Sequence, residues 1–275
     1  MEHLKIRVLG CSGAIAAGQR TTAFLVGDDV LVDAGTGVGE LSLDALLRID
    51  HVLLTHSHLD HIAALPLMAD SVMRLRHAAA RPPISVHALP QTLEALQTHI
   101  LNGIIWPDFC RLPTPQRPVM VFKPLQLGER RKLPHCVVQS LPASHTVPAV
   151  GYAVWPGDSA EQACWAFTGD TGPHPALWDA LAQLRVAHLV IEAAFSDAEE
   201  ALAQRSQHMN PSALAQALQR FASDAEIYIT HTKPADAAAI AADVARLGLS
   251  HRVHFLQAGQ CMTLGEPVET DVFCH

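Results

Sequence analysis

The chain has 275 residues and a formal net charge of −8, with 49% hydrophobic and 17% charged residues. This composition excludes a disordered chain, and the acidic balance argues against a nucleic-acid partner, because proteins that bind nucleic acids usually carry a basic stripe. The N-terminus has no signal-peptide pattern, no apolar run reaches membrane-spanning length, and the six cysteines form no CxxC pair. We therefore expect a cytoplasmic protein with reduced thiols and no membrane partner.

Short apolar runs separated by turn residues predict strands in the first third of the chain. These strands cover residues 6–9, 22–26, 30–32 and 52–54. A helix with apolar residues on one face is then predicted over 62–73, followed by a strand over 84–88.

The segment 91–118 has a different character, with a helical piece, an Asn-Gly-Ile-Ile-Trp-Pro-Asp-Phe stretch and a proline-rich run. We interpret it as an insertion that forms a lid or a subunit contact, so a homodimer is one possibility. Trp106 and Phe109 are candidates to bind a flat substrate by stacking, although packing or interface roles are more frequent for such aromatics.

The second half of the chain continues the alternation of strands and helices. Strands are predicted over 136–141, 150–154, 164–167, 187–191 and 227–229, and helices over 175–184, from 211 to about 221, and over 234–248. Each half has an apolar strand that ends in Thr-His, at Thr55-His56 and Thr230-His231. This pattern predicts a single α/β domain over residues 1–275, with two β layers between helices and a site at the seam of the two halves.

The stretch 55–61 has the HxHxDH spacing at which two metal ions bind side by side. His56 and His58 are two residues apart, so in an extended segment their side chains point the same way and can bind one ion. Asp60 and His61 then face a second ion. Imidazole and carboxylate ligands favour zinc, with manganese or iron as alternatives. A His-rich surface loop is the other interpretation, because the chain has 17 histidines.

Two metal ions need about seven protein ligands, and this motif supplies only some of them. His145, Asp170 and His231 each follow an apolar strand run closely, where side chains of packed sheets converge. We therefore predict that they complete the site. Asp33, at the end of a strand, either orients the metal-binding loop or closes a turn through nearby backbone amides.

The order of these residues resembles that of the metallo-β-lactamase fold superfamily, which implies a four-layer αββα sandwich. By that resemblance the first ion has the ligands His56, His58 and His145, the second has Asp60, His61 and His231, and Asp170 bridges them. Several exported β-lactamases of that superfamily carry Cys at the bridging position, so Asp170 disfavours drug hydrolysis.

Longer stretches resemble the class II cyclic-nucleotide phosphodiesterases; they are residues 57–62, 102–108, 191–195, 208–214 and 228–233. This resemblance implies hydrolysis of a 3′,5′-cyclic nucleotide such as cyclic AMP by a hydroxide that bridges two metal ions. Asp60 and His208 would be the catalytic residues. His208 would protonate the departing ribose oxygen or bind a phosphate oxygen, and Glu192 would orient it. Alternatively, His208 only caps the helix that follows.

Other enzymes share the same ligands. A tRNA 3′-processing endonuclease of the RNase Z type is the chief alternative, but such an enzyme usually needs a basic arm, and the chain has only four lysines. A thioester hydrolase of the glyoxalase II type is the second, and it gives the His208 motif no role. A non-catalytic scaffold would lack some of the ligands, and none is missing.

Overall fold

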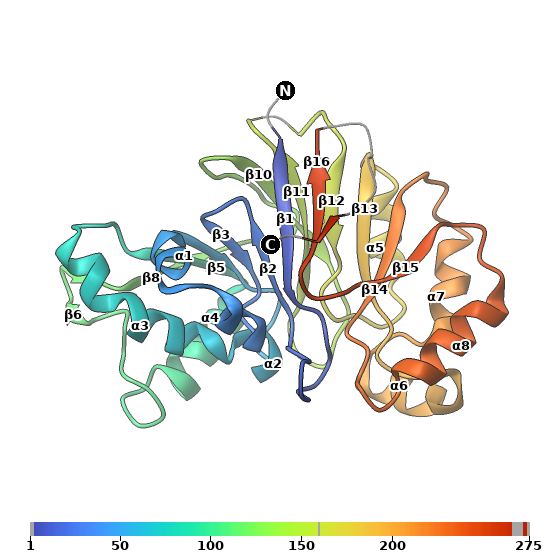
Figure 1. Cartoon of the computed structure of the whole chain (residues 1–275), viewed down its shortest axis with the longest axis horizontal. Helices are drawn as coiled ribbons and strands as arrows, with labels where there is room; N and C mark the ends of the chain where they lie inside the picture. The colour runs from blue at the N-terminus through green and yellow to red at the C-terminus, as the bar shows by residue number, and fades with distance from the viewer. Residues whose placement is uncertain (1–2, 159, 266–271, 274–275) are drawn as a thin grey trace.

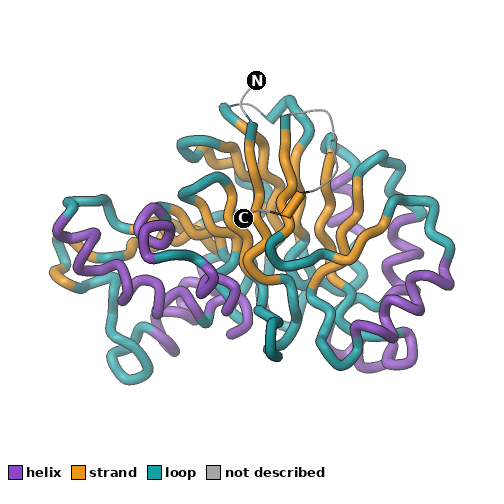
Figure 2. Tube along the Cα trace, in the orientation of Figure 1, coloured by secondary structure: helices purple, strands orange, loops and turns teal. Residues whose placement is uncertain are grey.

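Two large β-sheets face one another at the centre of the molecule, and helices cover their outer faces (Figures 1 and 2). The computed structural model describes residues 3–158 and 160–265, and the backbone of 272–273. The arrangement confirms the predicted α/β sandwich with two β layers between helices.

The first sheet has eight strands in the order β17-β16-β1-β2-β3-β4-β5-β8. The pairs from β17 to β3 are antiparallel, and those from β3 to β8 are parallel. The strands are β1 (Leu4–Gly10), β2 (Ala23–Val26), β3 (Val30–Val32), β4 (His51–Leu53), β5 (Ile84–Ala88), β8 (Met120–Pro124), β16 (Gln260–Leu264) and β17 (Val272–Phe273). All three residues of β3 are buried, as expected for a strand covered on both faces.

The second sheet has seven strands in the order β15-β14-β13-β12-β11-β10-β9. It also combines antiparallel pairs, from β9 to β12, with parallel pairs, from β12 to β15. The strands are β9 (Arg130–Lys132), β10 (Cys136–Pro142), β11 (Val150–Pro156), β12 (Cys164–Phe167), β13 (Val186–Glu192), β14 (Glu226–Thr230) and β15 (Val253–Phe255). The likeness of the two sheets agrees with the similar halves expected from the sequence.

The helices divide between the two outer layers (Figure 1). The first half has a 3₁₀ turn (Thr36–Glu40), α1 (Leu43–Arg48), α2 (Leu59–Ile62), α3 (Ala64–Ala78), α4 (Pro90–Ala95) and a π-helical turn (Leu96–Ile100). The second half has α5 (Pro175–Leu181), a 3₁₀ turn (Asp197–Glu199), α6 (Glu200–Ser206), α7 (Pro211–Leu218) and α8 (Ala237–Leu247). The sequence did not predict α1 and α6.

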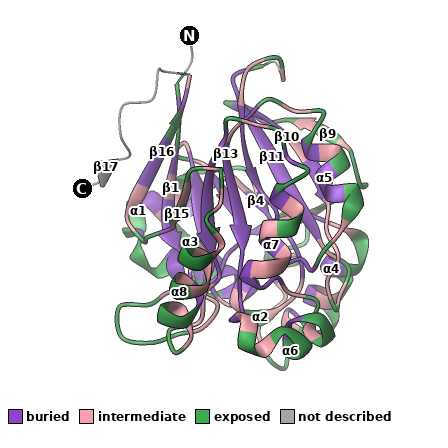
Figure 3. Cartoon of the chain, turned by 90° about the vertical axis from the view of Figure 1, so that its right-hand side faces the viewer, coloured by how far each residue is buried: buried purple, intermediate pink, exposed green. Residues whose placement is uncertain are grey.

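Three apolar cores hold the layers together (Figure 3). Between the sheets, the Phe24 ring lies 5.2 Å from the Trp165 ring and 4.9 Å from the Phe167 ring, centroid to centroid. Residues of α3 pack on the outer face of the first sheet, and residues of α5, α7 and α8 pack on the second. The cores fix the strands, so the loops after the strands are held in place.

The segment 91–118 contains α4, the π-helical turn and a small hairpin of β6 (Pro113–Thr114) and β7 (Arg117–Pro118). Phe109 is only 1% exposed and belongs to the core under α3, and Trp106 packs partly against the same core. The geometry therefore fits the packing alternative for both aromatics better than contact with a substrate. A subunit contact through this segment stays a prediction.

The cysteines depart in part from expectation. Cys11, Cys110, Cys136 and Cys164 are free thiols, and burial raises the pKa of each to about 12, which disfavours a nucleophilic role. Cys261 is disulfide-bonded, so the expectation of six reduced thiols is wrong at this residue. The absence of a CxxC motif does not exclude pairing at other spacings.

Across the described ranges, every helix is too short or too polar to cross a membrane.

An ion-pair cluster joins α3 to the loop before β4. Arg76 is buried and donates hydrogen bonds to the carbonyl oxygens of Leu47 and Ile49. It also donates to Asp50 Oδ1 at 2.6 Å, and Arg81 donates to Asp50 Oδ2 at 2.8 Å. Burial alone would raise the pKa of Asp50, but the hydrogen bonds from the two arginines lower it below its ordinary value.

This cluster should make stability depend on pH. A carboxyl group with a lowered pKa stabilises the fold above its unfolded pKa of about 3.9, and the contribution is lost as the pH falls through the folded value. We predict that Asp50→Asn lowers the free energy of unfolding at neutral pH by about 2 kcal/mol. Urea denaturation should show this difference shrinking in acid. An undiminished difference in acid, or an equal loss in the exposed α3 control Asp70→Asn, would contradict the account.

Candidate metal centre

The seven predicted ligands lie just beyond the carboxyl ends of strands from both sheets. The HxHxDH motif follows β4, His145 follows β10, Asp170 follows β12, and His231 follows β14. Ligands of α/β proteins commonly bind at this end of the strands. The structure brings all seven side chains together in two neighbouring groups.

The first group is His56, His58 and His145, whose candidate ligand atoms lie within 4.8 Å of one another. His58 Nδ1 and His145 Nε2 are 3.0 Å apart. Thr55 Oγ1 donates its proton to Asp33 Oδ2 at 2.8 Å, so His56 Nδ1, 2.9 Å away, has to donate to the Thr55 oxygen. This leaves the lone pair of His56 on Nε2, the atom that faces the group.

The second group is Asp60, His61, Asp170 and His231, again within 4.8 Å of one another. Asp170 has one carboxylate oxygen 3.4 Å from His61 Nε2 and the other 3.3 Å from His231 Nε2. The latter oxygen is also 3.8 Å from Nε2 of His56, a member of the first group. Asp170 therefore lies close to histidines of both groups, and its bridging role stays a prediction.

The donor atoms fit divalent metal ions. His56 Nε2, His61 Nε2 and Asp170 Oδ1 are buried and have no hydrogen-bond partner among the described residues. Such orphaned polar atoms are rare in proteins, and here they converge on one place. Burial lowers the pKa of His56; burial alone would raise that of Asp170, but His231 and His61 hold it well below its usual range. Carboxylate and neutral imidazole are the forms in which such side chains bind divalent ions, and their atoms lie close enough together for the cluster to hold metal ions.

Asp33 supports the metal-binding loop from inside the protein. It is fully buried and accepts hydrogen bonds from the Thr55 amide at 2.8 Å and from His61 Nδ1 at 2.6 Å. The bond to Nδ1 leaves His61 Nε2 for the ion. This geometry fits the orienting role rather than the turn-closing alternative. Asp33 and His231 both have left-handed backbone, with φ of 57° and 61°, which non-glycine residues adopt rarely and mostly at functional sites.

His208 lies beside the ligands and is paired with Glu192. Its Nδ1 is 2.7 Å from Glu192 Oε1, and its ring centroid lies 4.8 Å from that of His145 and 5.5 Å from that of His231. Glu192 is fully buried and also accepts the backbone amides of Thr171, Ala194 and Met209. The structure thus brings the predicted pair together. His208 also lies close enough to His145 and Asp170 to be considered as a ligand itself.

Sequence reasoning missed several supporting groups. Thr55 fixes the tautomer of His56, as described above, and the Gln207 carbonyl oxygen lies 3.1 Å from His145 Nδ1. The Thr171 hydroxyl accepts the amide of Ser144, next to His145. Thr55 stands within the motif, so its role could have been predicted from the sequence. The Gln207 carbonyl belongs to the backbone, so the sequence does not indicate its contact with His145.

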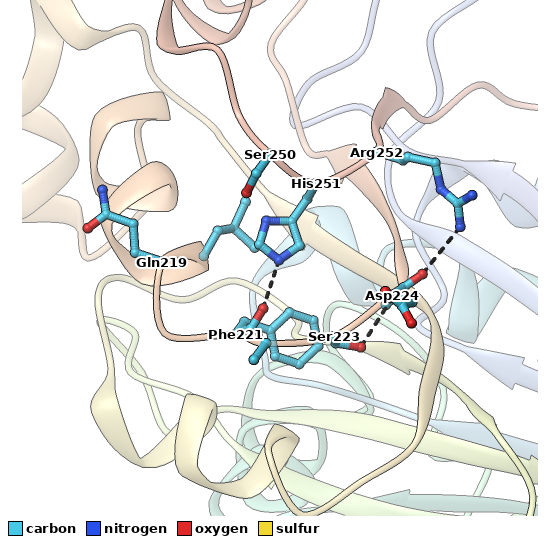
Figure 4. Close-up of a pocket in the computed structure, with 10 residues that line it drawn as sticks. Gln219, Phe221, Ser223, Asp224, Ser250, His251 and Arg252 are labelled. Atoms are coloured by element: carbon cyan, nitrogen blue, oxygen red, sulfur yellow. Dashed lines mark hydrogen bonds between the residues drawn. The ribbon is translucent and has the colours of Figure 1, made fainter.

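A cavity of about 810 Å³ lies elsewhere, at the opposite end of β14 from His231 (Figure 4). Its lining includes Phe221, His251 and Arg252, with His251 Nε2 2.7 Å from the Phe221 carbonyl oxygen. None of the predicted ligands lines it. Despite its volume, this cavity is therefore not part of the candidate metal centre.

Gly13 packs directly against His231, so the second group should be sensitive to a methyl group there. An added Cβ would lie 2.5 Å from the His231 carbonyl oxygen and 3.1 Å from its Nε2. We predict that Gly13→Ala weakens metal binding by about tenfold or more, because displaced groups around a ligand typically cost that much. Competition with a chromogenic chelator measures it. Gly39→Ala, where a Cβ meets nothing within 4 Å, is the control and should bind normally.

The sequence matches a known family and is similar to known proteins. A family model described as Beta-lactamase superfamily domain matches residues 29–244. A ribonuclease Z from Pyrobaculum calidifontis is 29% identical over 245 residues, which is 80% of this chain and 82% of that protein. The 3′,5′-cyclic-nucleotide phosphodiesterase 1 of Saccharomyces cerevisiae is 36% identical over 55 residues, which is 20% of this chain and 14% of that protein.

Two crystal structures are similar over nearly the whole chain. Unliganded yeast PDE1 has a TM-score of 0.76 at 19% identity, covering 96% of this chain and 99% of that one. YhfI of Bacillus subtilis, a metallo-beta-lactamase fold protein, has a TM-score of 0.74 at 17% identity, covering 96% and 100%. At such identities the likeness concerns the fold.

Proposed function

The chain belongs to the beta-lactamase superfamily and has the metallo-β-lactamase fold, and from that premise we propose that it is a hydrolase that cleaves phosphodiester bonds with two divalent metal ions. The observation that carries the proposal is the His208–Glu192 pair beside the ligands. A phosphodiester releases an alkoxide, which needs a proton far more than a thiolate does, since thiols are much stronger acids than alcohols. A proton donor at this place therefore favours a phosphodiester over a thioester.

Divalent ions held by the seven ligands would lower the pKa of water and neutralise charge on the phosphoryl oxygens. We propose zinc, with manganese or iron as alternatives. Burial alone would lower the pKa of His208, but the Glu192 carboxylate raises it above its ordinary value. With Nδ1 held by Glu192, His208 can carry a proton on Nε2 and pass it to the departing oxygen. Glu192 keeps its own orientation through three backbone amides.

The substrate that we propose is a 3′,5′-cyclic nucleotide. It is supported by the net charge of −8, because a chain with this charge offers little overall attraction to a long nucleic acid.

RNA is the second candidate substrate, in a reaction of the tRNA 3′-processing type. The ribonuclease Z from Pyrobaculum calidifontis is similar over 80% of this chain, whereas the similarity to the cyclic-nucleotide phosphodiesterase covers 55 residues. By length of match, the comparisons favour this alternative, and they count against the expectation that nucleic acid is an unlikely partner.

A side-by-side assay separates these activities. The zinc-loaded chain is given cyclic AMP, cyclic GMP, bis(p-nitrophenyl) phosphate, precursor tRNA and S-lactoylglutathione, and kcat/KM is compared. We expect hydrolysis of the phosphodiesters, with a cyclic nucleotide preferred over precursor tRNA. Preference for precursor tRNA would replace the substrate and keep the chemistry, whereas preference for the thioester would overturn the proposal.

A further inference from the structure

Lys233 lies at the edge of the metal centre, two residues after His231. Its Nζ sits over the ring of Phe195, 4.2 Å from the ring centroid. Phe195 is buried in a small apolar cluster with Ala194 and Ala203, and its ring centroid lies 5.6 Å from that of His208. The lysine is therefore held next to the His208–Glu192 pair by an aromatic ring.

This ammonium group has no acidic partner among the described residues. Other cations of the chain do pair: Arg76 and Arg81 with Asp50, and Lys132 with Asp158. A cation over an aromatic ring is attracted to the face of the ring but keeps its hydrogen-bond donors free, because the ring accepts none strongly. Lys233 is only partly exposed, so its charge is less screened than that of a surface lysine.

The charge of this ammonium reaches the metal centre. Lys233 Nζ lies 4.2 Å from the centroid of the Phe195 ring, and that centroid lies 5.6 Å from the centroid of the His208 ring, so the ammonium is near the imidazole. Four buried or half-buried carboxylates lie in or beside the metal centre, and their charge equals that of two divalent ions. A cation near them would therefore add attraction for the negative charge of a phosphodiester. The carboxylates are Asp33, Asp60, Asp170 and Glu192.

We propose that Lys233 binds a phosphoryl oxygen of the substrate and of the phosphomonoester product, and that Phe195 holds the ammonium in position. This inference rests on the proposed function, because it names the group that recognises the anion in that reaction. An ammonium with three free donors suits a phosphate oxygen. Phe195 acts through the lysine and is a positioning residue.

The test uses zinc-loaded protein and two measurements. We expect Lys233→Met to raise KM for bis(p-nitrophenyl) phosphate about tenfold, because a charge-assisted hydrogen bond to the anion is lost. Calorimetric titration with inorganic phosphate, which needs no turnover, should show binding weakened by about tenfold as well. Lys233→Arg, which keeps the positive charge, should have a KM and a phosphate affinity close to those of the wild type. Phe195→Leu, which keeps the apolar packing but removes the ring, should change both values in the same direction as Lys233→Met, but by less.

Lys132→Met is the matched control, because it removes the same charge from an exposed lysine of β9 and should change neither value. Phosphate binding that is equal in wild type and Lys233→Met would overturn the inference, as would an equal loss in Lys132→Met. If no phosphodiester is hydrolysed by the wild type, the proposed function fails, while selective loss of phosphate binding in Lys233→Met still supports Lys233 as the anion site.

Discussion

Asp170→Ala is expected to lower phosphodiester hydrolysis by roughly a thousandfold or more, because charge stabilisation by the metal centre is lost. Both oxygens of this carboxylate face imidazole nitrogens, at 3.3 Å from His231, 3.4 Å from His61 and 3.8 Å from His56. These histidines come from both groups of ligands. Removal of Asp170 should therefore reduce the metal content below two ions per chain as well as the activity.

Metal analysis of the purified variant, together with kcat for bis(p-nitrophenyl) phosphate, checks this prediction. Asp179→Ala on the exposed face of α5 is the control, and it should keep metal and activity. Retention of both ions by Asp170→Ala would contradict the bridging assignment. An unfolding midpoint equal to that of the apo wild type would show that the variant still folds.

His208→Ala is expected to lower kcat for cyclic AMP by about a hundredfold to a thousandfold, the usual contribution of a positioned proton donor. The metal content should stay unchanged, because His208 is not one of the seven predicted ligands and all seven remain. The loss should be much smaller for bis(p-nitrophenyl) phosphate, whose nitrophenolate leaves without needing a proton. This contrast between two substrates separates a proton donor from a residue that only supports the fold.

A second histidine-glutamate pair supplies the control for this prediction. His254 Nε2 lies 2.7 Å from Glu226 Oε2, the same distance as in the His208–Glu192 pair, but outside the metal centre. His254→Ala should leave kcat unchanged. Loss of metal from His208→Ala would show instead that His208 is a ligand, and an equal loss of rate for both substrates would argue against proton donation.

The sequence predicted the fold class, and it predicted that these histidine and aspartate side chains would cluster, because both depend on the positions of apolar runs along the chain. Apolar runs of strand length gave the two sheets, and residues such as His145 and Asp170 were identified by their position just after those runs. Strand ends meet at one edge of a sheet, so spacing along the chain translates into proximity in space. The superfamily resemblance then gave an order to the ligands.

Other features could not be predicted for physical reasons. Phe109 lies in a loop-rich segment where the sequence left both packing and substrate binding open, and the structure shows that it is buried in the core. The Gln207 carbonyl that contacts His145 belongs to the backbone and has no side-chain signal. Contact between Phe195 and Lys233 joins residues far apart in the sequence, and no local pattern records it.

The central claim is that one cluster of seven side chains holds two metal ions. The most direct measurement is the zinc content of the purified chain by inductively coupled plasma mass spectrometry, after incubation with excess zinc and gel filtration. We predict close to two ions per chain for the wild type. One ion or none, in protein that is folded, would contradict the account.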